Sequence, residues 1–220
     1  MIILTSGRSG SQRLVACLKN RKDIKVFGEI FNLHSAGSDK SLFDFDITKD
    51  KVIDKDLHAR MCTAEYLDKA IKKYDVFKVL YSHVKGDLYK ALDGKHMIML
   101  SRRNKFRCLV SVSLALRTGQ WTGHNDKARS FSMDFAETSG KIEKMLKQER
   151  FMFERYKPTV IYYEDNFEES YNTVCREMGI ELQKPIITTL PTGVSIEDVI
   201  ENFDELKELD REFYLTKENV

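Results

Sequence analysis

Ile2-Ile-Leu-Thr-Ser-Gly-Arg-Ser-Gly-Ser-Gln-Arg-Leu-Val-Ala-Cys-Leu18 is the stretch of sequence that decides the fold. Its apolar beginning, Ile2–Leu4, predicts a buried strand, and apolar residues at helical spacing predict a helix over Gln12–Asn20. The connecting residues Thr5–Ser11 are small and include two glycines. A loop between a strand and a helix N-terminus gathers backbone N–H groups at the positive end of the helix dipole. We therefore expect a phosphate or phosphosulfate site at this loop.

The composition of the chain excludes several classes of partner. Its 36 basic and 34 acidic residues give the 220-residue chain a net charge of +2, so we expect no general binding to nucleic acid or to a membrane surface. No apolar run reaches the roughly 18 residues that span a bilayer. The four cysteines lie far apart and form no CxxC pair, which argues against a disulfide framework or a zinc site. We expect one cytoplasmic domain over residues 1–220, without a bound metal.

Strand and helix patterns alternate along the chain, which favours an α/β fold. The predicted strands are Ile2–Leu4, Ile24–Phe27, Val76–Leu80, His96–Leu100 and Thr159–Tyr163. The predicted helices are Gln12–Asn20, Ala64–Tyr74, Asn104–Thr118, Met133–Tyr156 and Phe167–Met178. Together they predict a P-loop-like three-layer sandwich, in which a central parallel sheet of four to five strands carries helices on both faces.

The sequence also predicts how two helices begin. Ser132 is expected to cap the long helix over Met133–Tyr156, and Phe135 is expected to lie on its buried face. A further helix is expected over Ser195–Asn202, after a loop bracketed by two prolines.

The first loop differs from a nucleoside-triphosphate loop. That motif needs a lysine and a hydroxyl residue directly after its last glycine, whereas Gly10 is followed by Ser11 and Gln12. The point charge that would reach the terminal phosphates is therefore missing. Arg8, inside the loop, supplies a planar fork of N–H donors instead.

A second basic motif follows the strand predicted at His96–Leu100. Arg103 stands at the junction between this strand and the next helix, and Ser111 lies eight residues on, about two helical turns away. A guanidinium group and a hydroxyl group so placed can bind two sides of one phosphate. Arginines near a helix N-terminus oppose the helix dipole, and a bound anion would explain their presence.

These motifs resemble those of the sulfotransferases that use 3′-phosphoadenosine 5′-phosphosulfate (PAPS). Thr5–Ser11 is similar to the loop that binds the 5′-phosphosulfate, and Arg103–Ser111 is similar to the motif that binds the 3′-phosphate. Thr118–Trp121 resembles a stretch of the bacterial carbohydrate sulfotransferases, and Tyr162–Asp165 resembles the end of a later strand. Asp198–Leu206 is similar to a C-terminal asparagine segment of the family. The matches follow the family's order over nearly the whole chain.

The resemblance to bacterial carbohydrate, trehalose-type or tyrosylprotein sulfotransferases implies in-line transfer of a sulfuryl group from PAPS. The acceptor would be a hydroxyl group or an amine of a carbohydrate, small metabolite or peptide, and no metal is required. Arg8 would stabilise the charge of the leaving phosphate. The remaining donor-binding residues implied by the resemblance are Ser9, Gly10, Ser11, Gln12, Arg103 and Ser111. The polar segments His34–Lys51 and Gly119–Ser130 would define the acceptor.

Two residues are candidates for the general base, and the choice stays open. Glu29 follows a short predicted strand, where trehalose-type and tyrosylprotein sulfotransferases carry a catalytic glutamate. His83 follows the predicted strand Val76–Leu80, where cytosolic sulfotransferases carry a catalytic histidine. We favour Glu29, since a charged residue between two phenylalanines is unusual at a strand end.

Two other functions remain as alternatives. A small-molecule kinase could use the same strand, loop and helix, although the loop lacks its lysine. A nucleotide-binding module without catalytic activity could keep the PAPS site.

Overall fold

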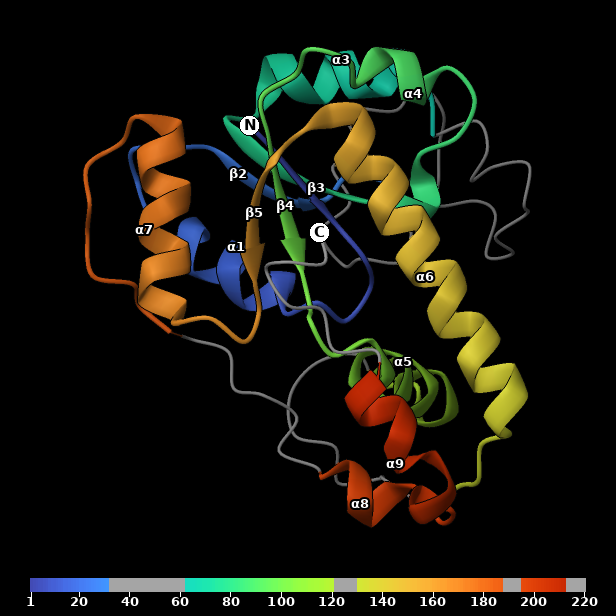
Figure 1. Ribbon diagram of the computed structural model, residues 1–220. Helices are drawn as coiled ribbons and strands as arrows, with labels where there is room; N and C mark the ends of the chain where they lie inside the picture. The colour runs from blue at the N-terminus through green and yellow to red at the C-terminus, as the bar shows by residue number, and fades with distance from the viewer. Residues whose placement is uncertain (32–61, 121–129, 188–194, 213–220) are drawn as a thin grey trace.

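The computed structural model describes residues 1–31, 62–120, 130–187 and 195–212, and these residues form an α/β fold built on one parallel sheet. The five strands are β1 (Ile2–Thr5), β2 (Val26–Glu29), β3 (Val76–Leu80), β4 (Met97–Ser101) and β5 (Thr159–Tyr162). Their order across the sheet is β2-β3-β1-β4-β5, and every pairing is parallel. Helices pack against both faces of the sheet (Figure 1). The predicted three-layer fold with a parallel sheet of four to five strands is confirmed.

Strand β1 occupies the centre of the sheet because it is apolar on both faces. Its residues Ile2, Ile3 and Leu4 are at most 2% exposed. Ile3 lies beside Lys78 of β3 on one side and beside Ile98 of β4 on the other. The loop that follows β1 therefore leaves the sheet at its middle, where the carboxyl ends of the neighbouring strands also converge.

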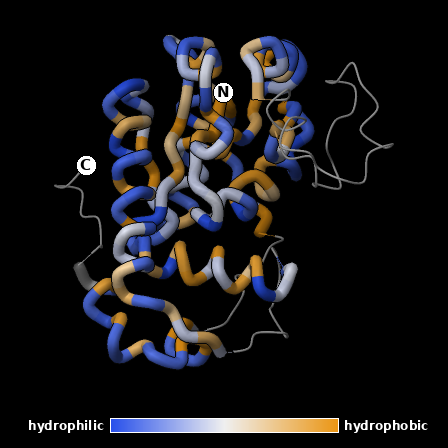
Figure 2. Tube along the Cα trace, turned by 90° about the vertical axis from the view of Figure 1, so that its right-hand side faces the viewer, coloured by the Kyte–Doolittle hydropathy of each residue, from blue (hydrophilic) through white to orange (hydrophobic). Residues whose placement is uncertain are grey.

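Each face of the sheet has its own helical layer and its own core. One face packs against α3 (Ala64–Lys73), α4 (Leu88–Ala91) and the C-terminal half of α6 (Phe135–Tyr156). The other face packs against α1 (Ser11–Lys19) and α7 (Phe167–Met178). Figure 2 shows apolar segments mainly inside the molecule, with polar residues along the outer sides of the helices.

A third core lies beyond the carboxyl ends of the strands. It joins α5 (Lys105–Thr118) and the first half of α6 to α8 (Ile196–Val199) and α9 (Phe203–Glu212). Figure 1 shows this helical lobe below the sheet, connected to the sheet layers by the long helix α6. The loop between β1 and α1 thus faces a lobe formed by α5 and its neighbours.

Three local expectations differ from the structure. The N-cap of α6 is Asp134, whose side chain accepts a hydrogen bond from the Glu137 N–H, while the Ser132 hydroxyl donates to Glu201 instead. Asp134 is the cap because it lies three residues before Glu137, which is the spacing over which a capping side chain reaches a free N–H group. Phe135 precedes the part of α6 that is covered, and it is 44% exposed.

The helix predicted over Ser195–Asn202 corresponds to the short helix α8, after which the chain turns into a separate helix, α9. Between them Ile200 forms a parallel bridge with Phe131, which interrupts the helical hydrogen bonding. Within the described residues, the structure contains no helix that is both long and apolar enough to cross a membrane.

Candidate anion site and neighbouring charge clusters

The loop after β1 is closed tightly around Gly10. This glycine is the N-cap of α1 and has a φ of 81°, a left-handed conformation that favours glycine. A Cβ atom at Gly10 would lie 2.1 Å from Cδ2 of Tyr163, so the tyrosine ring covers the glycine directly. The loop is also attached to β4, because the Thr5 hydroxyl donates a hydrogen bond to the Leu100 carbonyl at 2.8 Å. The thiol of Cys108 donates to the Gly7 carbonyl at 3.1 Å.

The loop residues predicted to bind the donor differ in exposure. The Ser9 hydroxyl is fully buried and bonds to Thr5 and to the Ser6 carbonyl, so its side chain holds the loop together. Ser11 begins α1 and is buried, whereas Gln12 is exposed. Ser11 and Gln12 occupy the first turn of the helix, where the N–H groups have no partner within the helix.

Arg8 joins the loop to the second predicted motif. Its Nε donates a hydrogen bond to the Ser111 hydroxyl on α5, at 2.8 Å. Arg8 has a φ of 63°, which is uncommon for a residue other than glycine. Burial lowers the pKa of the Arg8 guanidinium, and repulsion from the neighbouring charge of Arg102 adds to this effect. The structure therefore brings Arg8 of the loop together with Ser111 in the middle of α5.

Arg103 contacts an aromatic residue at the end of β5 and acidic residues directly after it. Its Nη1 donates to Asp165 at 2.5 Å, and its guanidinium lies 4.0 Å from the centre of the Tyr162 ring. Burial opposes the charged form, but the hydrogen bond and charge of Asp165 raise the pKa of Arg103. Glu164 accepts hydrogen bonds from the N–H groups of Arg103 and Asn104, at 2.9 and 3.2 Å. The Glu164 and Asp165 carboxylates thus hold the start of α5.

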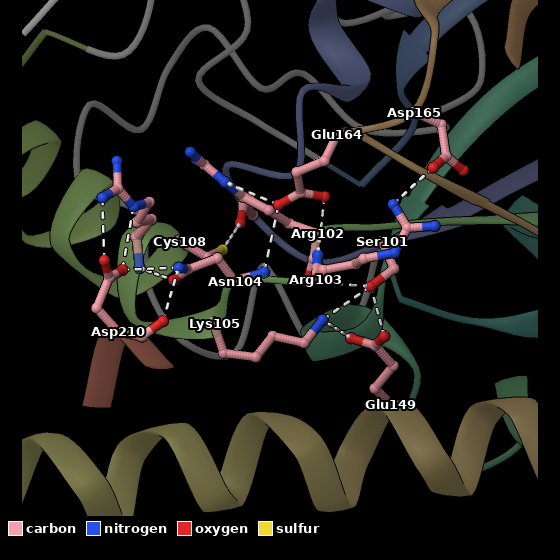
Figure 3. Close-up of polar contacts among 12 residues, drawn as sticks. Ser101, Arg102, Arg103, Asn104, Lys105, Cys108, Glu149, Glu164, Asp165 and Asp210 are labelled. Atoms are coloured by element: carbon pink, nitrogen blue, oxygen red, sulfur yellow. Dashed lines mark hydrogen bonds and ion pairs between the residues drawn. The ribbon is translucent and has the colours of Figure 1, made fainter. Parts of the chain in front are cut away.

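A fully buried ion pair lies behind the start of α5. Lys105 is 0% exposed and Glu149, on α6, is 5% exposed. The Lys105 ammonium donates to Glu149 at 2.5 Å and to the Ser101 hydroxyl at 2.7 Å, and this hydroxyl also donates to Glu149 (Figure 3). The buried phenol of Tyr81 lies near the cluster, and burial followed by the charge of Glu149 raises its pKa well above the usual value. The pair connects β4, α5 and α6.

The two candidate bases lie beside each other at the ends of β2 and β3. Nε2 of His83 is 3.8 Å from one carboxylate oxygen of Glu29, and the Lys78 ammonium is 3.0 Å from the other. The side chains of Glu29, His83 and Lys78 are 12, 9 and 10% exposed. The ring of Phe31 meets His83 edge-on, with 5.9 Å between the ring centres. Glu29, Lys78 and His83 form what we call the carboxylate cluster.

Sequence reasoning missed Lys78 and Tyr163 as members of these sites. The sequence pattern predicts only a buried strand at Val76–Leu80. A lysine inside such a strand is itself a sign that a charged partner is buried beside it. Tyr163 was read as part of a strand, and its contact with Gly10 joins residues that are distant in the sequence. Of the predicted acceptor segments, residues 34–51 and 121–129 lie outside the described residues, as does Trp121.

A cleft of about 490 Å³ lies along the edge strand β5, and its lining includes Tyr162 and Asp165, the two residues that contact Arg103. Its floor is formed by the edge of β5, and its walls come from α6 and α7. None of the predicted site residues lines it. Within the described residues, no group of three or more His, Cys, Asp or Glu side chains is arranged to hold a metal ion.

Comparison of the chain with protein-family models and with curated proteins finds no match.

Proposed function

We propose that this protein is a sulfotransferase that transfers the sulfuryl group of PAPS to a hydroxyl group or amine of a carbohydrate, small metabolite or peptide. The observation that carries the proposal is the hydrogen bond between Arg8 and Ser111. It joins the first loop to the motif after β4, the two stretches that resemble the phosphosulfate and 3′-phosphate motifs of PAPS-dependent sulfotransferases. A donor with two separate phosphate positions needs two such motifs side by side.

The chemistry of the loop fits the phosphosulfate end of this donor. The close approach of Tyr163 leaves no room for a side chain at Gly10, so only glycine fits this left-handed turn at the start of α1. The first N–H groups of α1 and the guanidinium of Arg8 would then bind peripheral oxygens. Arg103 and Ser111 would bind the 3′-phosphate, with Arg103 exchanging part of its contact with Asp165 for the ligand.

In the proposed reaction the acceptor oxygen or nitrogen forms a bond to the sulfur of PAPS. The bond between sulfur and the bridging phosphate oxygen breaks, and the electron pair remains on adenosine 3′,5′-bisphosphate. The sulfuryl group itself is neither oxidised nor reduced. Arg8 would stabilise the negative charge that develops on the leaving phosphate.

The carboxylate cluster would accept the proton of the acceptor. Glu29 is our first choice for the general base, and His83, whose Nε2 lies 3.8 Å from the Glu29 carboxylate, is the alternative. The Lys78 ammonium lies 3.0 Å from the Glu29 carboxylate and would help to orient this side chain toward the acceptor. The two residues that compete as bases in the sequence therefore belong to one cluster.

The test is calorimetric binding of adenosine 3′,5′-bisphosphate compared with ATP and Mg²⁺. A sulfotransferase should bind the bisphosphate at least about tenfold more tightly, because it has a second phosphate site and no loop lysine. A kinase should show the opposite preference. Tight binding of ATP with magnesium, without binding of the bisphosphate, would overturn the proposal.

A second measurement separates a catalyst from a module that merely binds the nucleotide. The protein is incubated with sulfur-labelled PAPS and pooled carbohydrate, metabolite and peptide acceptors, and labelled products are separated. Transfer of label that disappears in the Glu29→Gln variant supports the enzyme. Bisphosphate binding without any labelled product from these pools favours the module.

A further inference from the structure

Four basic residues follow β4 in close succession, and the structure gives them different partners. Arg103 contacts Asp165 at 2.5 Å, Lys105 contacts Glu149 at 2.5 Å, and Arg107 contacts Asp210 at 3.0 Å. For Arg102, the nearest carboxylate contact is with Glu164, at 3.7 Å, beyond hydrogen-bond distance. Figure 3 shows the contacts of Arg103 with Asp165 and of Lys105 with Glu149, with Arg102 and Lys105 extending in different directions.

Glu164 is already used by the backbone. Its two carboxylate oxygens accept hydrogen bonds from the N–H groups of Arg103 and Asn104. Within the described residues, Nε of Arg102 is buried and has no hydrogen-bond partner, and the side chain as a whole is 20% exposed. Leaving a guanidinium N–H buried without an acceptor is costly, so a missing acceptor is expected at this position.

Arg102 lies next to the anion loop rather than next to the partners of Arg103. Its guanidinium is 4.9 Å from the centre of the Tyr163 ring, the ring that covers Gly10. It is close enough to Arg8 for repulsion between the two positive charges to disfavour the charged form of Arg8. Two guanidinium groups held near each other beside a loop of N–H donors attract an anion.

We propose that Arg102 is a second ligand-binding guanidinium of the loop, and that Arg8 and Arg102 together bind one tetrahedral oxyanion. This inference rests on the proposed function and deepens it, since the oxyanion would be the 5′-phosphosulfate group of the donor. The loop has no lysine after Gly10, and Arg102 would provide a positive charge and a planar fork of N–H donors in its place. Tyr163 holds the Arg102 side chain against the loop through its ring face. Arg103 then remains for the 3′-phosphate.

The experiment compares two nucleotides that share one end. Adenosine 3′,5′-bisphosphate and adenosine 5′-phosphosulfate both carry a charged 5′-group, and the first alone carries a 3′-phosphate. Arg102→Gln should weaken the binding of both nucleotides at least about tenfold, because a charge-assisted hydrogen bond to the shared 5′-group is lost. Arg103→Gln should weaken the bisphosphate by a similar factor and leave the phosphosulfate within about twofold.

Two further variants control for folding and for net charge. Arg155→Gln removes the same charge from an exposed arginine near the end of α6 that pairs with Asp93, and it should leave both affinities unchanged. Arg102→Lys keeps the charge and loses the fork, so its affinities should fall between those of the wild type and Arg102→Gln. If Arg102→Gln unfolds, the lysine variant carries the test.

The possible outcomes separate this inference from the proposed function. If the wild type binds the bisphosphate and Arg102→Gln binds both nucleotides as well as the wild type, the role of Arg102 is refuted and the proposed function stands. Loss confined to the bisphosphate would move Arg102 to the 3′-phosphate and overturn its placement at the loop. If the wild type prefers ATP with magnesium, the proposed function fails on its own.

Discussion

Two groups of charges lie within three residues of each other at the start of α5, and they differ in how their charge is compensated. Lys105 is fully buried and forms hydrogen bonds with Glu149 and Ser101. Arg102 is partly exposed, lacks an acceptor for its Nε within the described residues, and stands near the like charge of Arg8. The charge of Lys105 is compensated within the protein, whereas Arg102 is the residue that we propose binds an anion. Charge compensation therefore distinguishes a structural cation from a ligand-binding one.

The largest effect on stability is expected at the buried pair. Lys105→Met leaves the Glu149 carboxylate buried without its cation, which should lower the free energy of unfolding by roughly 3–5 kcal/mol in urea denaturation. The double variant Lys105→Met, Glu149→Leu should recover much of this loss, because both charges are gone. Equal losses in the single and double variants would mean that the pair is not the source of the effect.

The next effect is expected at the loop. Gly10→Ala adds a Cβ that overlaps the Tyr163 ring at a left-handed backbone position, with a combined cost of roughly 2–4 kcal/mol. Calorimetry should show bisphosphate binding reduced at least about 30-fold. Gly7→Ala is the matched control within the loop, since a Cβ there meets nothing within 4 Å. A similar loss in both variants would show that any change in the loop disturbs the site.

A smaller effect is expected in the carboxylate cluster. Glu29→Gln removes the charge that faces Lys78, which should lower the free energy of unfolding by roughly 1–3 kcal/mol. The bisphosphate affinity should change by less than about twofold, because the donor does not depend on this carboxylate. Glu65→Gln, at an exposed helical pair, should change neither quantity measurably. A large loss of bisphosphate affinity in Glu29→Gln would contradict the separation of donor and base sites.

The smallest effect is expected at the helix that carries Glu149. Asp134→Ala removes the N-cap of α6 and should cost about 1 kcal/mol in thermal or urea unfolding. Ser132→Ala should cost less, since this hydroxyl contacts the exposed Glu201. The reverse order would restore Ser132 as the cap.

The sheet could be predicted because its signals are local. The strand Val76–Leu80 and the helix Phe167–Met178 have the predicted bounds, since each is a compact apolar run or an apolar stripe at helical spacing. The C-terminal part was harder to predict. The bridge between Phe131 and Ile200 divides a segment that looks continuously helical in sequence, and its two residues are 69 positions apart.

The sequence predicts the two basic motifs of the site but not which acidic residue contacts each basic side chain. The sequence indicates an anion loop and a basic motif, but it does not show which of the arginines in the motif has a carboxylate partner. Arg103 is matched by Asp165, 62 residues away, while Lys105 is matched by Glu149, 44 residues away. Such partners depend on the packing of β5 and α6 against α5, which no local pattern encodes.

The central position of β1 affects the order in which the sheet can form while the chain is being translated. The loop is translated before the residues that it contacts. Leu100, the partner of Thr5, follows 95 residues later, and Ser111, the partner of Arg8, follows 103 residues later. At 5–20 residues per second, that delay is roughly 5–20 seconds. During this time an apolar strand must stay unpaired in the nascent chain, because parallel neighbours arrive late. Strand β1 therefore gains its parallel neighbours only after β3 and β4 have been translated, and Arg8 gains its partner Ser111 later still.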